Sequence, residues 1–159
     1  MPYPSITLRP ATPADYASMR ALDDRLIAEA ALPGATRADF QRFQHRFTDS
    51  ALADKDPKSR LIVAEDENGA ILGYMHLKPT HDDVLDRETG YLSIIAVAES
   101  ATGKGVGRLL MKAAEDWARE QGYPSLLLDV FASNETAIGF YKKNRFGEDS
   151  VRFRKKLAR

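Results

Sequence analysis

The chain has 159 residues, enough for one domain with a substantial core, so we expect residues 1–159 to form a single domain. Its 23 basic and 23 acidic residues balance, which argues against nucleic-acid binding through phosphate neutralisation, and the lack of cysteine excludes disulfides, a thiolate nucleophile and a cysteine-based zinc site. No apolar run approaches the ~20 residues that span a bilayer, and Met1-Pro2-Tyr3-Pro4 lacks the features of a signal peptide. We therefore expect a cytoplasmic protein without a metal, nucleic-acid or membrane partner.

The first part of the chain is predicted to form a strand and two helices. Apolar and polar residues alternate up to Pro10, and Thr12-Pro13-Ala14-Asp15 has the form of a capping box with proline at the first helical position. Apolar residues at helical spacing predict a helix over 16–30, which Leu32-Pro33-Gly34 ends. A second capping signal, Thr36-Arg37-Ala38-Asp39, predicts the second helix.

The middle of the chain is predicted to form an antiparallel meander. Strands over 61–65 and 71–77 flank Glu67-Asn68-Gly69, in which Asn-Gly favours a hairpin turn. A third, hydrophobic strand covers 92–97. Between the last two strands lies the carboxylate-rich segment 80–88, which is either a solvated turn or a negative mouth that attracts a cationic amine.

An aromatic stripe on the second predicted helix also has two interpretations. Phe40, Phe43 and Phe47 recur at helical spacing, so they are predicted to face the core. Part of the same stripe could line a substrate pocket.

A glycine-rich segment lies between the strand at 92–97 and an amphipathic helix that Gly122 and Pro124 end. The first turn of a helix has unpaired N–H groups and a partial positive charge, and glycine lets a ligand approach the backbone closely. Gly103, Gly105 and Gly107, with Lys104 and Arg108 beside them, therefore predict an anion cradle suited to phosphates.

The cradle does not match two common nucleotide motifs. No Lys-Ser or Lys-Thr follows the glycines, which excludes a Walker A loop, and the spacing fails the dinucleotide pattern G-x-G-x-x-G. Thr102-Gly103-Lys104-Gly105-Val106-Gly107 instead resembles the acyl-CoA loop Q/R-x-x-G-x-G/A of the GCN5-related N-acetyltransferase (GNAT) family, with Thr102 in place of the usual glutamine or arginine. That substitution weakens one phosphate contact and leaves the backbone cradle intact.

A second motif strengthens this resemblance. The apolar run 126–130 predicts a buried parallel strand, 134–144 a helix, and the alternation over 151–156 a last edge strand. The segment from Asn134 to Phe146 resembles the family pattern N-x-x-A-x-x-F-Y-x-K-x-G-F, with Arg145 where glycine is usual.

The resemblance implies an α/β fold of the GNAT type. That fold is a mostly antiparallel mixed sheet flanked by about four helices, in which two central parallel strands splay apart and acyl-CoA enters the gap. Here those strands would be Leu92–Val97 and Leu126–Val130.

The resemblance also implies roles for individual residues. It assigns acetyl-CoA, as the acyl donor, to Ile95, Ala96 and Val97 of the central strand, to Asn134, and to the glycine segment with its flanking residues. The residues of that segment are Thr102, Gly103, Lys104, Gly105, Val106, Gly107 and Arg108. Tyr141 is the candidate acid that protonates the leaving thiolate, because its ordinary pKa of about 10 lies above that of a thiol. Asn134 would bond the pantetheine arm and could equally cap its helix.

The base is less clearly marked. An alkyl ammonium has a pKa near 10, so making it reactive at pH 7 costs about 4 kcal/mol. Family members often carry a glutamate where this chain has Tyr91. We expect Glu88, just upstream, or an ordered water that Ser93 could hold, to take the proton.

These inferences predict an N-acetyltransferase that acetylates a primary amine on a small molecule by direct attack in a ternary complex. One alternative is an acetyltransferase for protein N-termini or lysines. Another is a non-catalytic acyl-CoA-binding regulatory module. A homodimer through the predicted edge strand near Val151–Leu157 is compatible with the sequence.

Overall fold

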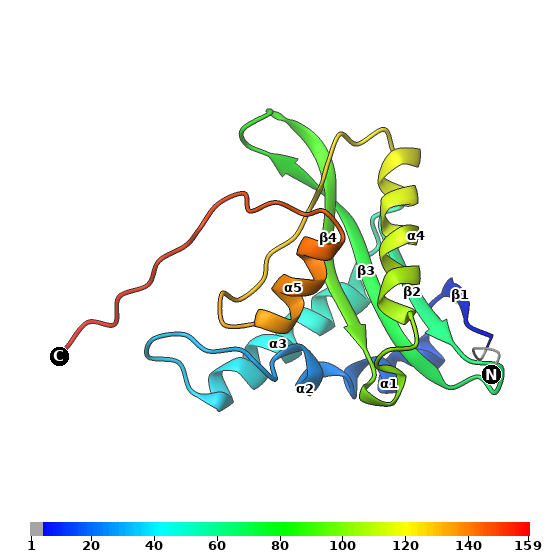
Figure 1. Ribbon diagram of the computed structural model, residues 1–159, viewed down its shortest axis with the longest axis horizontal. Coiled ribbons are helices and arrows are strands. Elements are labelled where there is room, and N and C mark those ends of the chain that lie inside the picture. Colours follow the sequence, from blue (N-terminus) through cyan, green and yellow to red (C-terminus); the bar gives the residue numbers. More distant parts are fainter. Residues whose placement is uncertain (1–4) are drawn as a thin grey trace.

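The computed structural model describes residues 5–159, so Met1–Pro4, where no signal peptide was predicted, lie outside the described residues. At its centre is a five-stranded sheet with the order β1-β2-β3-β4-β5 (Figure 1). Neighbouring strands are antiparallel except for β4 and β5, which are parallel. The strands are β1 (Thr7–Pro10), β2 (Arg60–Glu65), β3 (Ile71–Asp82), β4 (Arg87–Val97) and β5 (Leu126–Leu127).

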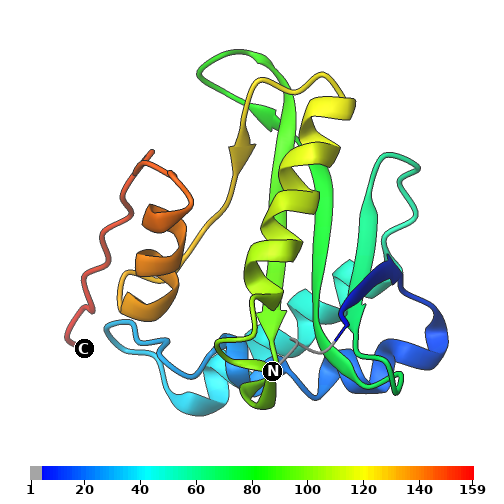
Figure 2. The same cartoon turned by 45° about the vertical axis from the view of Figure 1, so that its right-hand side comes forward.

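Helices cover both faces of the sheet (Figure 2). On one face α4 buries Leu110 and Trp117 against β3 and β4, and on the other the first three helices pack around Tyr74 of β3. The fifth helix packs on the start of α4 through Phe140. The helices are α1 (Tyr16–Arg20), α2 (Asp23–Leu26), α3 (Arg37–Ala53), α4 (Val106–Glu120) and α5 (Glu135–Lys143), with 3-10 turns at Pro13–Asp15 and Glu99–Ala101. No helix of the described chain is both long and apolar enough to cross a membrane.

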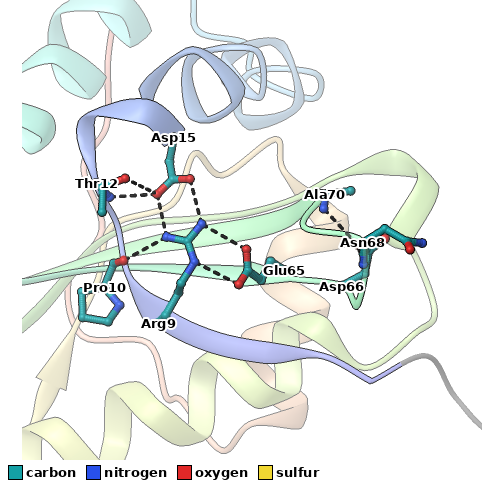
Figure 3. Close-up of polar contacts among 8 residues, drawn as sticks. All are labelled: Arg9, Pro10, Thr12, Asp15, Glu65, Asp66, Asn68 and Ala70. Carbon is teal, nitrogen blue, oxygen red and sulfur yellow. Dashed lines mark hydrogen bonds and ion pairs between the residues drawn. The ribbon is translucent and has the colours of Figure 1, made fainter.

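The first capping signal fixes the N-terminal strand to the sheet (Figure 3). Asp15 accepts a hydrogen bond from the Thr12 N–H at 2.8 Å and two more from the Arg9 guanidinium at 2.8 and 2.9 Å. Arg9 also binds Glu65 of β2 at 3.0 Å. The hydrogen bonds from Arg9 are the main reason that the pKa of Asp15 falls to about 2. This cluster therefore joins β1, the first turn and β2.

The other helix signals are largely confirmed. Thr36 and Asp39 form the predicted capping box at the start of α3. The helix predicted over 16–30 is interrupted, however, because the chain turns at Leu22. The turn buries Leu22 and lets the carboxylate of Asp23 accept a 2.6 Å hydrogen bond from Thr48 of α3.

The segment 80–88 is mostly strand, because β3 runs to Asp82 and β4 begins at Arg87. The Asp82 carboxylate accepts the N–H groups of Val84 and Leu85 at 2.9 and 3.0 Å, which forms a tight turn. The acidic segment therefore forms a turn, the first of the two interpretations given for it above.

Two C-terminal predictions are wrong. β5 covers only Leu126–Leu127 of the strand predicted to continue to Val130, and the segment over 151–156 is not a strand. With so short a β5, the sheet offers little edge for a further strand, and the basic residues of that segment repel one another. A strand at Val151–Leu157 is therefore absent as an interface, and a homodimer stays a prediction.

Candidate active site

The parallel strands β4 and β5 are paired only at their beginning. Gly90 pairs with Leu126 and Tyr91 with Leu127, and beyond Tyr91 no strand of the described chain borders this edge of β4. The chain after β5 diverges from β4 on its way to α5 (Figure 2). The two strands thus separate before Val97, as the resemblance implied.

The open edge of β4 carries the peptide groups of Ile95 and Val97. A Cβ atom on Gly73 of β3 would lie 2.6 Å from the carbonyl oxygen of Ala96, so this carbonyl faces β3. Because hydrogen-bonding groups of successive residues in a strand point to opposite edges, those of Ile95 and Val97 face the gap. Arg25 of α2 donates to the Val97 carbonyl at 3.2 Å, and both N–H groups remain available as donors. The backbone of Ala96, by contrast, points away from the gap.

The glycine segment forms an open turn at the start of α4. Gly103 and Gly105 have φ angles of 79° and 81°, in the left-handed region, and apart from the adjacent residues no heavy atom lies within 4 Å of where their Cβ atoms would be. Among the described residues, the N–H groups of Gly105, Val106, Gly107 and Arg108 have no hydrogen-bond acceptor. Unpaired N–H groups beside open space are suited to bind an anion.

The remaining residues of this segment divide into two groups. Thr102, Lys104 and Arg108 are exposed beside the free N–H groups, so their side chains can add polar contacts and positive charge. Val106 is buried in the core, and only its N–H can contact a ligand. A Cβ on Gly107 would lie 3.2 Å from the Phe140 ring, so this glycine permits close packing of α4 and α5.

Asn134 begins α5 on the far side of the gap. Its side-chain oxygen accepts the N–H of Ala137 at 3.1 Å, so Asn134 is the helix N-cap. Because the oxygen is used in this way, the side-chain NH₂ group is the part of Asn134 that can bind a ligand.

Tyr141 lies on the same helix, between the rings of Phe140 and Phe146. Burial raises the pKa of its hydroxyl to about 12, so the hydroxyl is protonated at neutral pH and can donate a proton. Arg145, at the position of the usual glycine, has a φ of 67°. The Phe146 N–H still reaches the Tyr141 carbonyl at 3.0 Å, so the helix ends as it would with glycine there.

A carboxylate that the sequence analysis did not select faces the same region. Asp129, just after β5, accepts a 2.5 Å hydrogen bond from the Tyr91 hydroxyl. Burial, this hydrogen bond and the proximity of Tyr141 raise the pKa of Tyr91. Asp129 was assigned to an apolar strand because it follows three leucines, and only the separation of β5 from β4 exposes it.

An aromatic group lies on the α3 side of the sheet. The ring centroid of Phe131 is 5.4 Å from that of Phe40 and 6.0 Å from that of Phe43. Phe40 is buried, whereas Phe43 is 38% exposed. The stripe of α3 therefore contributes to the core through Phe40 and to an exposed aromatic surface through Phe43, and its part in a substrate pocket stays a prediction.

Glu88 is not brought together with these residues. It lies near the hairpin end of β4, opposite His81 of β3, whereas Val97 is at the other end of the strand. Its carboxylate binds Lys58 at 2.8 Å and the Tyr123 hydroxyl at 2.9 Å. These hydrogen bonds, that of Lys58 first, lower the pKa of Glu88.

Comparison with known proteins agrees with this geometry. Residues 24–147 match the model of the acetyltransferase (GNAT) family. The chain is 30% identical to the uncharacterised N-acetyltransferase YhfO of Bacillus subtilis over 117 residues, which covers 70% of this chain and 78% of YhfO. It is 36% identical to the streptothricin acetyltransferase of Streptomyces lavendulae over 92 residues, covering 58% of this chain and 47% of that protein.

A solved structure has the same fold. The putative acetyl transferase of Pyrococcus furiosus superposes with a TM-score of 0.78 at 22% identity, covering 96% of this chain and all of that chain.

Proposed function

Because the chain belongs to the acetyltransferase (GNAT) family, whose enzymes use acetyl-CoA, we propose that it acetylates the primary amine of a small molecule by direct attack in a ternary complex. The observation that carries the proposal is the open edge of β4 at Ile95 and Val97, which lies next to the unpaired N–H groups of α4. A thioester with a phosphate-bearing arm needs donors at both places.

The residues of the site fit acetyl-CoA as a substrate. In our proposal the N–H groups at 105–108 hold its phosphates, helped by Lys104 and Arg108, and Thr102 adds a weaker contact. The amide NH₂ of Asn134 donates to the pantetheine arm. The N–H groups of Ile95 and Val97 bind the arm and the thioester oxygen, and stabilise the negative charge that this oxygen gains during attack.

Tyr141 acts as the acid in this proposal. The buried hydroxyl is protonated at neutral pH and can hydrogen-bond the leaving sulfur. Because its raised pKa lies above the value near 8.5 of a thiol, donation to the thiolate is uphill by itself, and we couple it to the proton that the attacking amine loses during acyl transfer.

The side of the gap that faces α3 supports a compact amine as acceptor. The phosphates lie by α4, so the amine approaches from the opposite face of the sheet. There the Asp129 carboxylate can attract an ammonium group, and Phe43 and Phe131 can contact an apolar part of the molecule. The name of the streptothricin acetyltransferase describes action on a small molecule, which favours this class over a protein substrate.

Release of free thiol from acetyl-CoA, measured against a panel of small amines, peptides with free N-termini and lysine peptides, tests the proposal. We expect release with a small amine that depends on amine concentration. Activity confined to the peptides would favour the protein-acetylating alternative. Calorimetric binding of acetyl-CoA without turnover on any acceptor would favour a regulatory module.

A further inference from the structure

A chain of three polar side chains crosses the face of the sheet that α3 covers. The Ser93 hydroxyl of β4 lies 2.5 Å from Nδ1 of His76 on β3, and Nε2 of His76 lies 2.8 Å from a carboxylate oxygen of Asp54. The His76 residue is only 3% exposed. A buried histidine bonded through both ring nitrogens has a defined orientation and defined partners.

The direction of the hydrogen bonds follows from the charge of Asp54. Burial tends to raise its pKa, but hydrogen bonds, including those from the Asp56 N–H and from His76, outweigh burial and lower it. An ionised carboxylate only accepts hydrogen bonds, so Nε2 of neutral His76 bears the proton. Nδ1 is then an acceptor, and the Ser93 hydroxyl donates to it.

A β-bulge places Ser93 beside the gap. β3 and β4 change register between His76 and Leu77, where β4 has one residue more than β3. Ser93 is this additional residue, and it lies two positions before Ile95 on the strand that borders the gap. Ser93 reaches His76, on the α3 side of the sheet from which the amine approaches.

The other end of the chain of hydrogen bonds reaches the surface. Asp54 follows α3 and lines a cavity of about 430 Å³ between β1, β2 and the end of α3. Arg9, Lys55 and Arg60 also line this cavity. A proton that arrives at Asp54 therefore has a route to solvent that does not pass back through the gap.

We propose that Ser93, His76 and Asp54 form the proton path that deprotonates the acceptor amine. This inference rests on the proposed function. Ser93 Oγ accepts a proton from the ammonium group as its own proton passes to Nδ1 of His76. The resulting imidazolium is neutralised by Asp54, and its proton leaves through the cavity. The ammonium loses one proton in this step. The amine nitrogen loses a second proton during acyl transfer. That proton replaces the one that Tyr141 donates to the thiolate.

Few other charged groups face His76. Burial is the main cause that lowers its pKa, and Lys78 on the same strand acts in the same direction, whereas Asp54 raises it. Tyr91 of β4 pairs with Lys78, and the β2 residue opposite His76 is the uncharged Leu61. His76 is thus neutral at rest and holds a proton only transiently, as a relay requires.

The test compares Ser93→Ala, His76→Gln and Asp54→Asn with the unaltered chain, on the best amine of the panel, from pH 6.5 to 10. At pH 7 we expect Ser93→Ala to lower kcat/KM for the amine at least tenfold, with little change in acetyl-CoA affinity. The deficit should shrink to about twofold near pH 10, where much of the amine is already neutral. An analogue of the same amine with its pKa lowered by neighbouring fluorine atoms should show the smaller deficit already at pH 7.

His81→Gln is the matched control, because His81 is an exposed histidine that pairs with Asp86 on the β3–β4 hairpin, far from the gap. It should leave the pH profile unchanged. Since His76 is buried, His76→Gln is interpreted only with a melting temperature close to that of the parent. Ser93→Ala removes one oxygen atom and carries the test if His76→Gln does not fold.

Four results would overturn the proposal. A deficit of Ser93→Ala that is equal at all pH values and for both amines would assign the serine a structural role. Unchanged turnover of Ser93→Ala, in an enzyme active on amines, would remove the relay and leave the proposed function intact. A pH-dependent loss in Glu88→Gln, absent from Ser93→Ala, would return the base to Glu88. If the unaltered chain released thiol with no amine, the proposed function would fail, and the relay with it.

Discussion

Replacing Tyr141 with phenylalanine removes one hydroxyl and tests the assignment of the acid. The ring packs between Phe140 and Phe146, and phenylalanine keeps these contacts. Burial raises the pKa of the hydroxyl to about 12, so it is almost fully protonated at pH 7.5. General acids contribute about 10²–10⁴-fold to rate, and water can partly replace a lost donor. We therefore expect turnover to fall at least tenfold, or about 1.4 kcal/mol in the activation barrier.

The assay is steady-state thiol release with Tyr141→Phe and its parent, together with calorimetry of acetyl-CoA binding. Affinity should change little, because the hydroxyl acts on the leaving thiolate and not on the bound thioester. Because the pKa of the Tyr141 hydroxyl is raised, the hydroxyl stays protonated up to about pH 10. Turnover of the parent enzyme should therefore show no loss between pH 7 and 10 from ionisation of Tyr141. Undiminished turnover in Tyr141→Phe would remove the tyrosine as the acid.

Three further predictions concern the backbone and the N-terminal cluster. Gly105→Val should weaken acetyl-CoA binding at least 100-fold by calorimetry and should also lower the stability of the fold. Gly69→Val is the control, because Gly69 has the same φ of 81° and equally open surroundings, and it should lower stability without weakening binding. Equal affinities of the two variants for acetyl-CoA would refute the cradle. Arg145→Gly should stabilise the fold by about 0.5–1 kcal/mol in urea unfolding, because it relieves a left-handed φ of 67°, and a loss of stability would contradict this. Asp15→Ala should cost about 2 kcal/mol at pH 7. Since the pKa of Asp15 falls from 3.8 to about 2 on folding, this difference should persist above pH 4 and disappear as the pH drops toward 2; a constant difference would refute it.

Local signals predicted most of the fold. The Thr36–Asp39 capping box, the Asn-Gly turn and the Gly122 stop each determine an element end through contacts within a few residues, and all three lie where expected. The C-terminal strand failed because alternation over 151–156 cannot reveal whether a partner edge exists, and β5 is too short to offer one.

The site was predictable where it depends on the backbone and less so where it depends on distant side chains. The glycine segment could be recognised from its place between a strand and a helix, and the start of α5 from its resemblance to the family pattern. Asp129 and His76 could not, because each acquires its partner from another strand: Tyr91 in one case, Ser93 in the other. Glu88 was selected because it is close to Tyr91 in sequence. Closeness in sequence could not reveal that its carboxylate pairs with Lys58.

The bulge at Ser93 changes which residue numbers of β4 face each edge of the strand. Before it, the Gly90 N–H points to β5, where it meets the Ser125 carbonyl at 3.2 Å, so even-numbered residues face that edge. After it, odd-numbered residues such as Ile95 and Val97 do, because Ser93 adds one residue to the count. Deleting Ser93 would leave Ile94 directly after Leu92, so the Ile95 and Val97 amides would still face the gap, and the strand would lose only the hydroxyl that reaches His76. The inserted residue thus adds a polar group to β4 without changing which of its amides form the binding surface.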